Sequence, residues 1–224
     1  MTDDSTPAPG YSFRDYTAAL RAFRGAGYAV TGFAEFLADP QPKHLILRHD
    51  LDNSLEQALR IARLDADSDC RSTFFVRVHA RGYNLLSLPS LKAILEIESM
   101  GHAVELHLEG GFSDVFGGDN DSWADRQRTV FEAAVARELH GFSLHEPARM
   151  GNLDFADRLL ERWGNPVFYH AYESRFMMPT MKYLSDSSGH WREGHFALWV
   201  DQVPQLQVLT HPFWWFETTP AENY

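Results

Sequence analysis

Two aspartates that directly follow an apolar run are the first residues whose spacing could support chemistry. Asp50 and Asp52 come at the end of HLILRH, residues 44–49, which has the composition of a buried strand. Residues i and i+2 of an extended segment point to the same side, so both carboxylates can enter one pocket. Two close carboxylates do different jobs when a metal holds one ionised and the other can take a proton. The alternative is that Asp52 or Asn53 only caps the next helix.

Histidines in the segment GHAVELHL are candidate metal ligands. His102 and His107 are five residues apart, so on a strand they point to opposite faces and would not bind one ion together. His107, at the end of the predicted strand, is the better ligand. We expect His102 to anchor the loop that enters the strand.

A third candidate group is LTHPFWW, where His211 ends an apolar run and three aromatic residues follow at 213–215. A histidine held at a strand end beside apolar rings is suited to general acid catalysis. The aromatic rings, Trp214 among them, suit stacking on a sugar face or closing one end of a barrel. For two of the three, plain core packing explains them equally well.

Alternating strands and helices must position these residues. We predict a helix, a turn and a second short helix before residue 40, and then a series of strands near 45–49, 73–78, 102–107, 141–145, 166–170, 181–185 and 206–210. Helical patterns separate most of these strands, which predicts a parallel sheet, either open or closed into a barrel. The segment 110–123, rich in glycine and aspartate, is predicted to be a long loop.

Polar residues gather where the predicted strands end, which is where β/α barrels carry their chemistry. The strand ends carry Arg48, His49, Asp50 and Asp52; Arg77 and His79; His107 and Glu109; His145 and Glu146; His170; Asp186; and His211. So many converging histidines are difficult to attribute to packing, because buried polar groups cost stability unless they are paired. A metal site on this rim is the simplest explanation.

Composition limits the class of protein and its partners. The chain has 224 residues, a length that suits one domain over 11–224 after a short disordered lead-in at 1–10. Its formal net charge is −11. The acidic balance argues against nucleic acid or an anionic membrane as the main partner. The single cysteine and the lack of a signal peptide or of a long apolar run favour a cytoplasmic protein without membrane insertion. The sequence is compatible with a homo-oligomer.

HDLD after a strand, GHAVELH and LTHP, in this order and at these separations, resemble the polysaccharide deacetylase superfamily of carbohydrate esterases. The similarity is greatest to the branch with an HDxD signature, associated with surface-polysaccharide biosynthesis, whose members also have a segment that resembles SDSSGHWREG at 185–194. The resemblance covers roughly residues 44–216. It implies an α/β fold, a distorted (β/α)7 barrel, and metal-dependent removal of an acetyl group from an amino sugar or glycan precursor.

The resemblance also implies roles for single residues. Asp50 matches the general base, Asp52 a metal ligand, and His211 the general acid. His107 matches the first of two ligand histidines, but the second falls on Gly111.

Another side chain must then complete the metal site, with His145 or Glu109 as candidates. The arginine-containing third motif of the family is also absent. Because GFSLHEP stands in its place, we expect His145 and Glu146 to take over its supporting role.

These observations combine into one hypothesis. Asp52, His107 and His145 hold a divalent metal, most simply Zn²⁺, although such ligands also suit Fe, Co, Ni or Mn. Asp50 and His211 act as base and acid. A further set of rim residues contacts the carbohydrate: His49, Arg77, Glu146 and Trp214.

Two other functions remain open. One is a metal-dependent amidohydrolase that acts on a non-sugar amide, because fold does not fix function. The other is a non-catalytic carbohydrate-binding pseudoenzyme, which Gly111 in the place of a ligand supports. Asp50 beside Asp52, together with His211, argues against a pseudoenzyme, because binding alone needs neither a base nor an acid.

Overall fold

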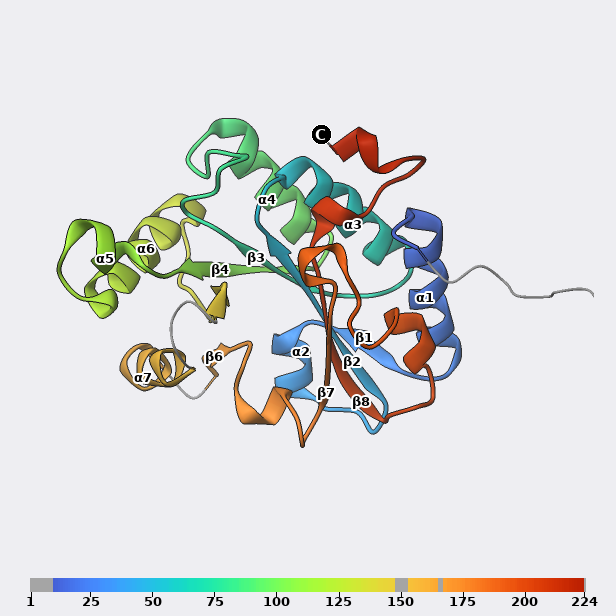
Figure 1. The fold of residues 1–224 in the computed structure, drawn as a ribbon. Helices are drawn as coiled ribbons and strands as arrows, with labels where there is room; N and C mark the ends of the chain where they lie inside the picture. The colour runs from blue at the N-terminus through green and yellow to red at the C-terminus, as the bar shows by residue number, and fades with distance from the viewer. Residues whose placement is uncertain (1–9, 148–152, 165–166, 224) are drawn as a thin grey trace, which may run out of the picture.

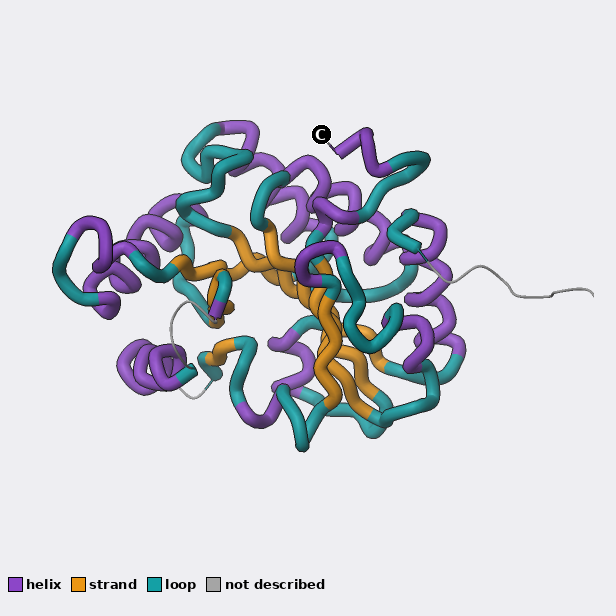
Figure 2. The backbone as a smooth tube through the Cα atoms, in the orientation of Figure 1, coloured by secondary structure: helices purple, strands orange, loops and turns teal. Residues whose placement is uncertain are grey.

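A curled parallel sheet forms the centre of the protein. The computed structural model describes residues 10–147, 153–164 and 167–223. Within them the strand order is β6-β5-β4-β3-β2-β8-β7, with β1 paired to β2 beside this path. The strands are β1 (Ala29–Thr31), β2 (His44–Leu51), β3 (Thr73–Val76), β4 (Ala103–Glu109), β5 (Gly141–His145), β6 (Tyr169–His170), β7 (Lys182–Ser185) and β8 (Gln205–Thr210). Figures 1 and 2 show that the sheet curls into a half-barrel, which confirms the predicted distorted (β/α)7 architecture.

Helices cover the outside of the curl. They are α1 (Phe13–Gly25), α2 (Phe33–Ala38), α3 (Leu55–Asp67), α4 (Leu88–Ser99), α5 (Phe112–Phe116), α6 (Asn120–Val135) and α7 (Asp154–Trp163). In α3, the Ser54 side chain caps the first turn by accepting a hydrogen bond from the Gln57 backbone N–H. Helical spacing then turns Ala58, Ile61 and Ala62 towards the core, where they are fully buried. No helix in the described part of the chain is long and apolar enough to cross a membrane.

Strand β2 lies near the middle of the sheet, and all eight of its residues are buried. Its side chains alternate between the two faces. Arg48 and Asp50 face the inside of the curl, where Arg48 also contacts Gln207 of β8. His49 points the other way, towards α3, and lies 2.9 Å from a carboxylate oxygen of Asp65.

The curl stays open between β6 and β7, since no strand pairing among the described residues joins them. The segment 171–181 fills this gap. The Gln207 side-chain amide donates hydrogen bonds to the carbonyl oxygens of Ala171 and Phe176, both at 3.0 Å. A side chain from β8 thus satisfies backbone acceptors that a strand would otherwise pair.

Most of the predicted elements are present, with two differences. The predicted turn before residue 33 contains β1, a strand of three residues that is too short to show a period of two. The predicted loop at 110–123 contains α5 and the start of α6. The predicted lead-in lies outside the described residues except for Gly10, as does residue 166 at the start of the sixth predicted strand.

A buried carboxylate ties α3 to the sheet and to α1. Asp65 is fully buried and accepts hydrogen bonds from the Tyr16 hydroxyl at 2.5 Å and the Ser72 hydroxyl at 2.7 Å. The His49 ring contributes a third contact. Because every partner is itself out of water, loss of the carboxylate would leave buried polar groups without partners.

We therefore expect Asp65→Ala to lower the free energy of unfolding by about 3–5 kcal/mol, because each buried polar group left unsatisfied costs about 1–3 kcal/mol. Urea denaturation measures this change. Asp67→Ala removes an exposed carboxylate from the same helix and should shift stability by no more than about 0.5 kcal/mol. If the two variants are equally stable, the network does not hold α3 in place.

Candidate metal centre and active site

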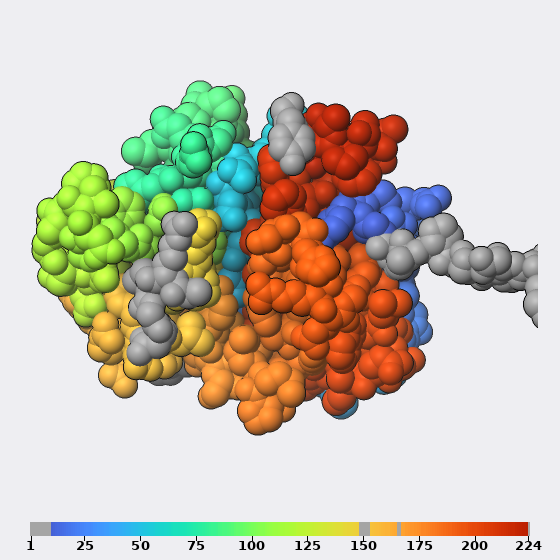
Figure 3. Space-filling model, in the orientation of Figure 1, coloured from blue at the N-terminus to red at the C-terminus, as the bar shows by residue number. Residues whose placement is uncertain are grey.

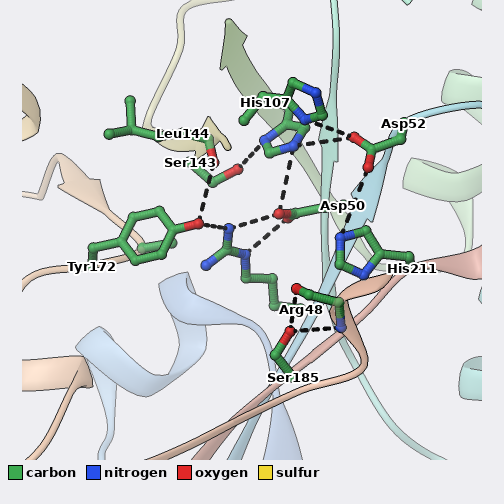
Figure 4. A network of polar contacts seen from close by, with 12 residues as sticks. Arg48, Asp50, Asp52, His107, Ser143, Leu144, Tyr172, Ser185 and His211 are labelled. Carbon is green, nitrogen blue, oxygen red and sulfur yellow. Dashed lines mark hydrogen bonds and ion pairs between the residues drawn. The ribbon is translucent and has the colours of Figure 1, made fainter. Parts of the chain in front are cut away.

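Three side chains from β2, β4 and β5 meet at the carboxyl ends of the sheet, in which β3 lies between β2 and β4. Asp52 follows β2, His107 is on β4, and His145 ends β5. Asp52 Oδ1 lies 3.4 Å from His107 Nε2 and 3.1 Å from His145 Nδ1. One potential ligand atom from each residue lies within 4.8 Å of the other two. Figure 4 shows Asp52 and His107 facing one another.

The polar atoms of this group fit a divalent cation. Asp52 Oδ1 is buried and has no hydrogen-bond partner among the described residues, although two ring nitrogens are close to it. A divalent cation would satisfy such a buried acceptor. His107 Nδ1 is 2.6 Å from the Ser143 hydroxyl, which orients the ring so that Nε2 faces Asp52. Burial opposes ionisation of Asp52, but the His107 and His145 rings lower the pKa of its carboxyl well below the usual range.

The structure favours His145 over Glu109 as the third ligand. Glu109 Oε2 instead lies 2.8 Å from the Arg77 guanidinium. Gly111, where the family places a histidine, has a left-handed backbone with φ of 81° at the start of α5, and a Cβ there would meet no atom within 4 Å. His102 lies near the start of β4, bonded to the Ala62 carbonyl oxygen, and so anchors the entry to that strand as expected.

Asp50 lies beside the metal group and is held by Arg48. The guanidinium donates two hydrogen bonds, from Nε to Oδ1 at 2.8 Å and from Nη2 to Oδ2 at 2.7 Å. Asp50 Oδ2 is also 3.5 Å from His107 Nε2. Burial would raise the pKa of Asp50, but the Arg48 guanidinium beside it holds the pKa below its ordinary value. Asp50 is therefore an ionised acceptor.

Arg48 is the functional residue to which the sequence analysis assigned no role. We expected His145 and Glu146 to replace the missing family arginine, whereas the guanidinium against Asp50 comes from the same strand. Arg48 also donates a hydrogen bond to the Tyr172 hydroxyl at 2.8 Å (Figure 4). Its spacing of two residues from Asp50 places both on one face of β2, and this signal was available in the sequence.

His211, beyond the end of β8, faces the cavity from the opposite side. Its Nδ1 is 2.6 Å from Asp186 Oδ1, and its Nε2 is 3.9 Å from Asp52 Oδ2. Asp186 is fully buried and also accepts a hydrogen bond from Trp215 Nε1 at 3.0 Å. Burial disfavours the imidazolium, but the Asp186 carboxylate, supported by Asp50 and Asp52, outweighs burial and raises the pKa of His211 to about 9. His211 is thus protonated at neutral pH.

These groups open into one cavity of about 630 Å³. It is lined by Asp50, Asp52, His107, Leu144, His145, Glu146, Pro147, Tyr172, Tyr183, Ser187, Ser188, Arg192, Leu209, His211 and Trp214. Figure 3 shows a groove between the green and yellow half of the chain and the orange and red half. Glu146 and Trp214, two of the residues expected to contact a substrate, both line this cavity.

Two residues expected to bind substrate are placed elsewhere. His49 is fully buried on the other face of β2, between Thr210 and Asp65, so its expected role is wrong. The alternation that brings Asp50 and Asp52 together is what turns His49 away. Arg77 is 6% exposed, paired with Glu109, and does not line the cavity. Arg77 therefore lies outside the cavity lining and holds Glu109 at the carboxyl end of β4.

Comparisons with known proteins support the fold of this chain but do not show its function. No model of a known protein family matches the sequence, and no curated protein matches it. Among solved structures, the chain is similar to a mutant of BA3943, a CE4 family pseudoenzyme with restored enzymatic activity, with a TM-score of 0.50, 18% identity, and coverage of 77% of this chain and 58% of that one. Wild-type BA3943 from Bacillus anthracis has a TM-score of 0.46 and 16% identity, over 77% and 56% of the two chains.

The CE4 family belongs to the polysaccharide deacetylase superfamily, so the half-barrel is consistent with the distorted (β/α)7 barrel of those enzymes. The present chain spans little more than half the length of BA3943.

Removal of single side chains tests the ligand set. Asp52→Asn, His107→Ala and His145→Ala should each weaken zinc binding at least about 10-fold, because each takes away one of three protein ligands. Equilibrium dialysis of metal-free protein measures the affinity. Glu109→Gln is the matched control and should bind zinc as the native chain does. Zinc loss in Glu109→Gln with full retention in His145→Ala would make Glu109 the third ligand.

Proposed function

We propose that this protein is a metal-dependent hydrolase that removes an acetyl group from an amino sugar or glycan precursor. The observation that carries the proposal is the content of one cavity: a three-ligand group, an ionised Asp50 and a protonated His211. Hydrolysis of an amide needs a base for water, an electrophile for the carbonyl and an acid for the leaving amine. The cavity contains a candidate base, a candidate acid and the side chains that would hold a metal as the electrophile.

Asp52, His107 and His145 are the residues that would hold the cation. When bound there, it would lower the pKa of water to roughly 7 and polarise the amide carbonyl. Asp50 accepts the proton of the attacking water, and the two hydrogen bonds from Arg48 fix the direction of its carboxylate. These bonds also lower the basicity of Asp50, so the cation held by the three ligands would have to make the water more acidic for this transfer to occur.

His211 completes the reaction as the general acid. Its Nδ1 is bonded to Asp186, so its Nε2 carries the proton that faces the cavity. Nε2 gives this proton to the nitrogen of the leaving amine as the carbon–nitrogen bond breaks. Without that transfer the amine would leave as an unstable anion. Asp186 keeps the ring oriented and stabilises its charged form, the role that a buried carboxylate plays beside other catalytic histidines.

The substrate class rests on the cavity wall and on the resemblance of the sequence motifs. Trp214 and Glu146 both line the cavity, and an aromatic ring and a carboxylate are side chains that suit an apolar sugar face and sugar hydroxyls. The formal charge of −11 continues to argue against nucleic acid.

A carbohydrate-binding pseudoenzyme is the second candidate. The similar solved structure belongs to a family member described as a pseudoenzyme, in a mutant form with restored activity, and Gly111 replaces a ligand of the family here. His145 near Asp52 and the buried Asp186 behind His211 favour catalysis, since binding a sugar requires neither.

Asp50→Asn separates the base from the ligands. The amide keeps the shape of the side chain but cannot take the proton of water, so acetate release from N-acetyl sugars should stop. Metal content, measured by plasma emission spectrometry, should stay at the native level because Asp50 is not a ligand. Asp52→Asn should lose metal and activity together. Equal metal loss in both variants would show that the two carboxylates share the ion, and Glu146 would be the next candidate for the base.

His211→Ala tests the acid. The variant should retain metal and lose roughly 10²- to 10⁴-fold in the rate of amide hydrolysis, the usual contribution of a general acid. The loss should be smaller on an activated aryl acetate, whose leaving group departs without a proton. Comparison of kcat for the two substrates measures the difference. An equal loss on ester and amide would mean that His211 is a ligand or a structural residue.

A further inference from the structure

Arg192 is a cation on the cavity wall whose charge is not used within the fold. It is exposed, lines the cavity of the proposed active site, and has no hydrogen bond or ion pair with any residue in the described part of the chain. The other two permanent or near-permanent cations of this site are both neutralised: Arg48 by Asp50 and His211 by Asp186. In a chain with a net charge of −11, an unpaired guanidinium facing a cavity is available for a ligand.

The segment 186–194 that carries Arg192 is fixed at several points. Asp186 is buried against His211 and Trp215. Gly189 lies against the ring of Trp214, because a Cβ added to this glycine would be 3.5 Å from the nearest ring atoms. The ring of Trp191 is 5.5 Å from those of His195 and Phe196. Arg192 therefore extends from a backbone that is anchored on both sides.

A second cavity adjoins the first at Arg192. It has a volume of about 250 Å³ and shares Tyr183, Ser187 and Arg192 with the larger cavity. Its wall also includes the Ser185 hydroxyl, bonded to that of Ser187 at 2.6 Å, and His190. Arg192 thus lines both cavities, and Glu193, which also lines the second one, is paired with Lys182.

Ser188 adds a strained position on the same wall. Its backbone has φ of 62° and ψ of 25°, the left-handed region that non-glycine residues seldom adopt. Its side chain lines the larger cavity and has no partner among the described residues. Such strain persists at ligand sites, where the surrounding structure imposes it. Here Asp186 and Gly189 hold the two sides of the turn.

We propose that the substrate carries an anionic oxygen group, phosphoryl or carboxylate, which Arg192 binds at the boundary of the two cavities while the acetamido group lies between Asp52 and His211. The planar guanidinium can bind either group with two parallel hydrogen bonds, and the Ser188 hydroxyl is a further donor. This inference rests on the proposed function for the position of the acetamido group, but its test reads binding and not turnover.

The test is isothermal titration calorimetry on Asp50→Asn protein, which holds a substrate without turning it over. The ligands are N-acetylglucosamine, its 1-phosphate, its 6-phosphate and N-acetylmuramic acid, which carries a carboxylate. At least one anionic sugar should bind roughly 10- to 100-fold more tightly than the neutral one, the range for a charge-assisted bidentate contact. Adding Arg192→Ala should remove this advantage and change binding of the neutral sugar by less than about twofold.

Two further variants control for charge and geometry. Arg21→Ala removes an exposed arginine from α1, outside the lining of both cavities, and should leave every affinity unchanged. Arg192→Lys keeps the charge but loses the planar fork, so it should retain only part of the advantage. The anionic sugar whose affinity exceeds that of the neutral sugar by the largest factor shows whether the site prefers a phosphate or a carboxylate.

Equal affinity for neutral and anionic sugars, equal effects of Arg192→Ala and Arg21→Ala, or binding of none of the four ligands would overturn the inference. Selective binding through Arg192 in a chain whose native form releases no acetate would leave this inference standing and reject the proposed hydrolysis. Acetate release by the native protein, together with no gain in affinity for any anionic sugar from Arg192, would support the proposed hydrolysis and reject this inference.

Discussion

Arg48 and Asp50 share one face of β2 and form a bidentate ion pair that is almost entirely out of water. Removing two charges from water is costly, and only good geometry with further hydrogen bonds compensates for it. Tyr172 and Gln207 supply those bonds to the guanidinium. Gln207 in turn holds the segment that fills the open side of the barrel. The interaction that keeps Asp50 ionised is thus continuous with the contacts that complete the fold.

A second buried pair, His211 with Asp186, faces the first across the cavity. The two pairs place opposite charges on the cavity wall, a negative charge on Asp50 and a positive charge on His211. The Asp52 carboxylate lies 3.4 Å from His107 Nε2 and 3.9 Å from His211 Nε2. Because their surroundings keep Asp50 ionised and His211 protonated, one residue can accept a proton and the other can donate one at the same pH. The resulting site is built from strand ends, and helices only support it from outside.

The sequence predicted the sheet and the core of the site because strand periodicity is a local property. The period of two predicted that Asp50 and Asp52 point to the same side, and it favoured His107 over His102 as a metal ligand. The same rule, applied throughout, would have excluded His49 and included Arg48. The choice of His145 over Glu109 could not be made locally, since it depends on how β4 and β5 align and on Arg77, which pairs with Glu109. Gln207, which holds the segment that fills the open side of the barrel, likewise acts through contacts with residues more than about 30 positions away.

Titration of metal-free native protein with zinc, with acetate release from an N-acetyl sugar measured at each addition, tests the central claim most directly. The account predicts no release at the start and a linear rise that stops at one equivalent, because Asp52, His107 and His145 form one group of ligands beside one base and one acid. Tight binding of one equivalent without release of acetate from any N-acetyl sugar, or release that is the same without metal, would contradict it.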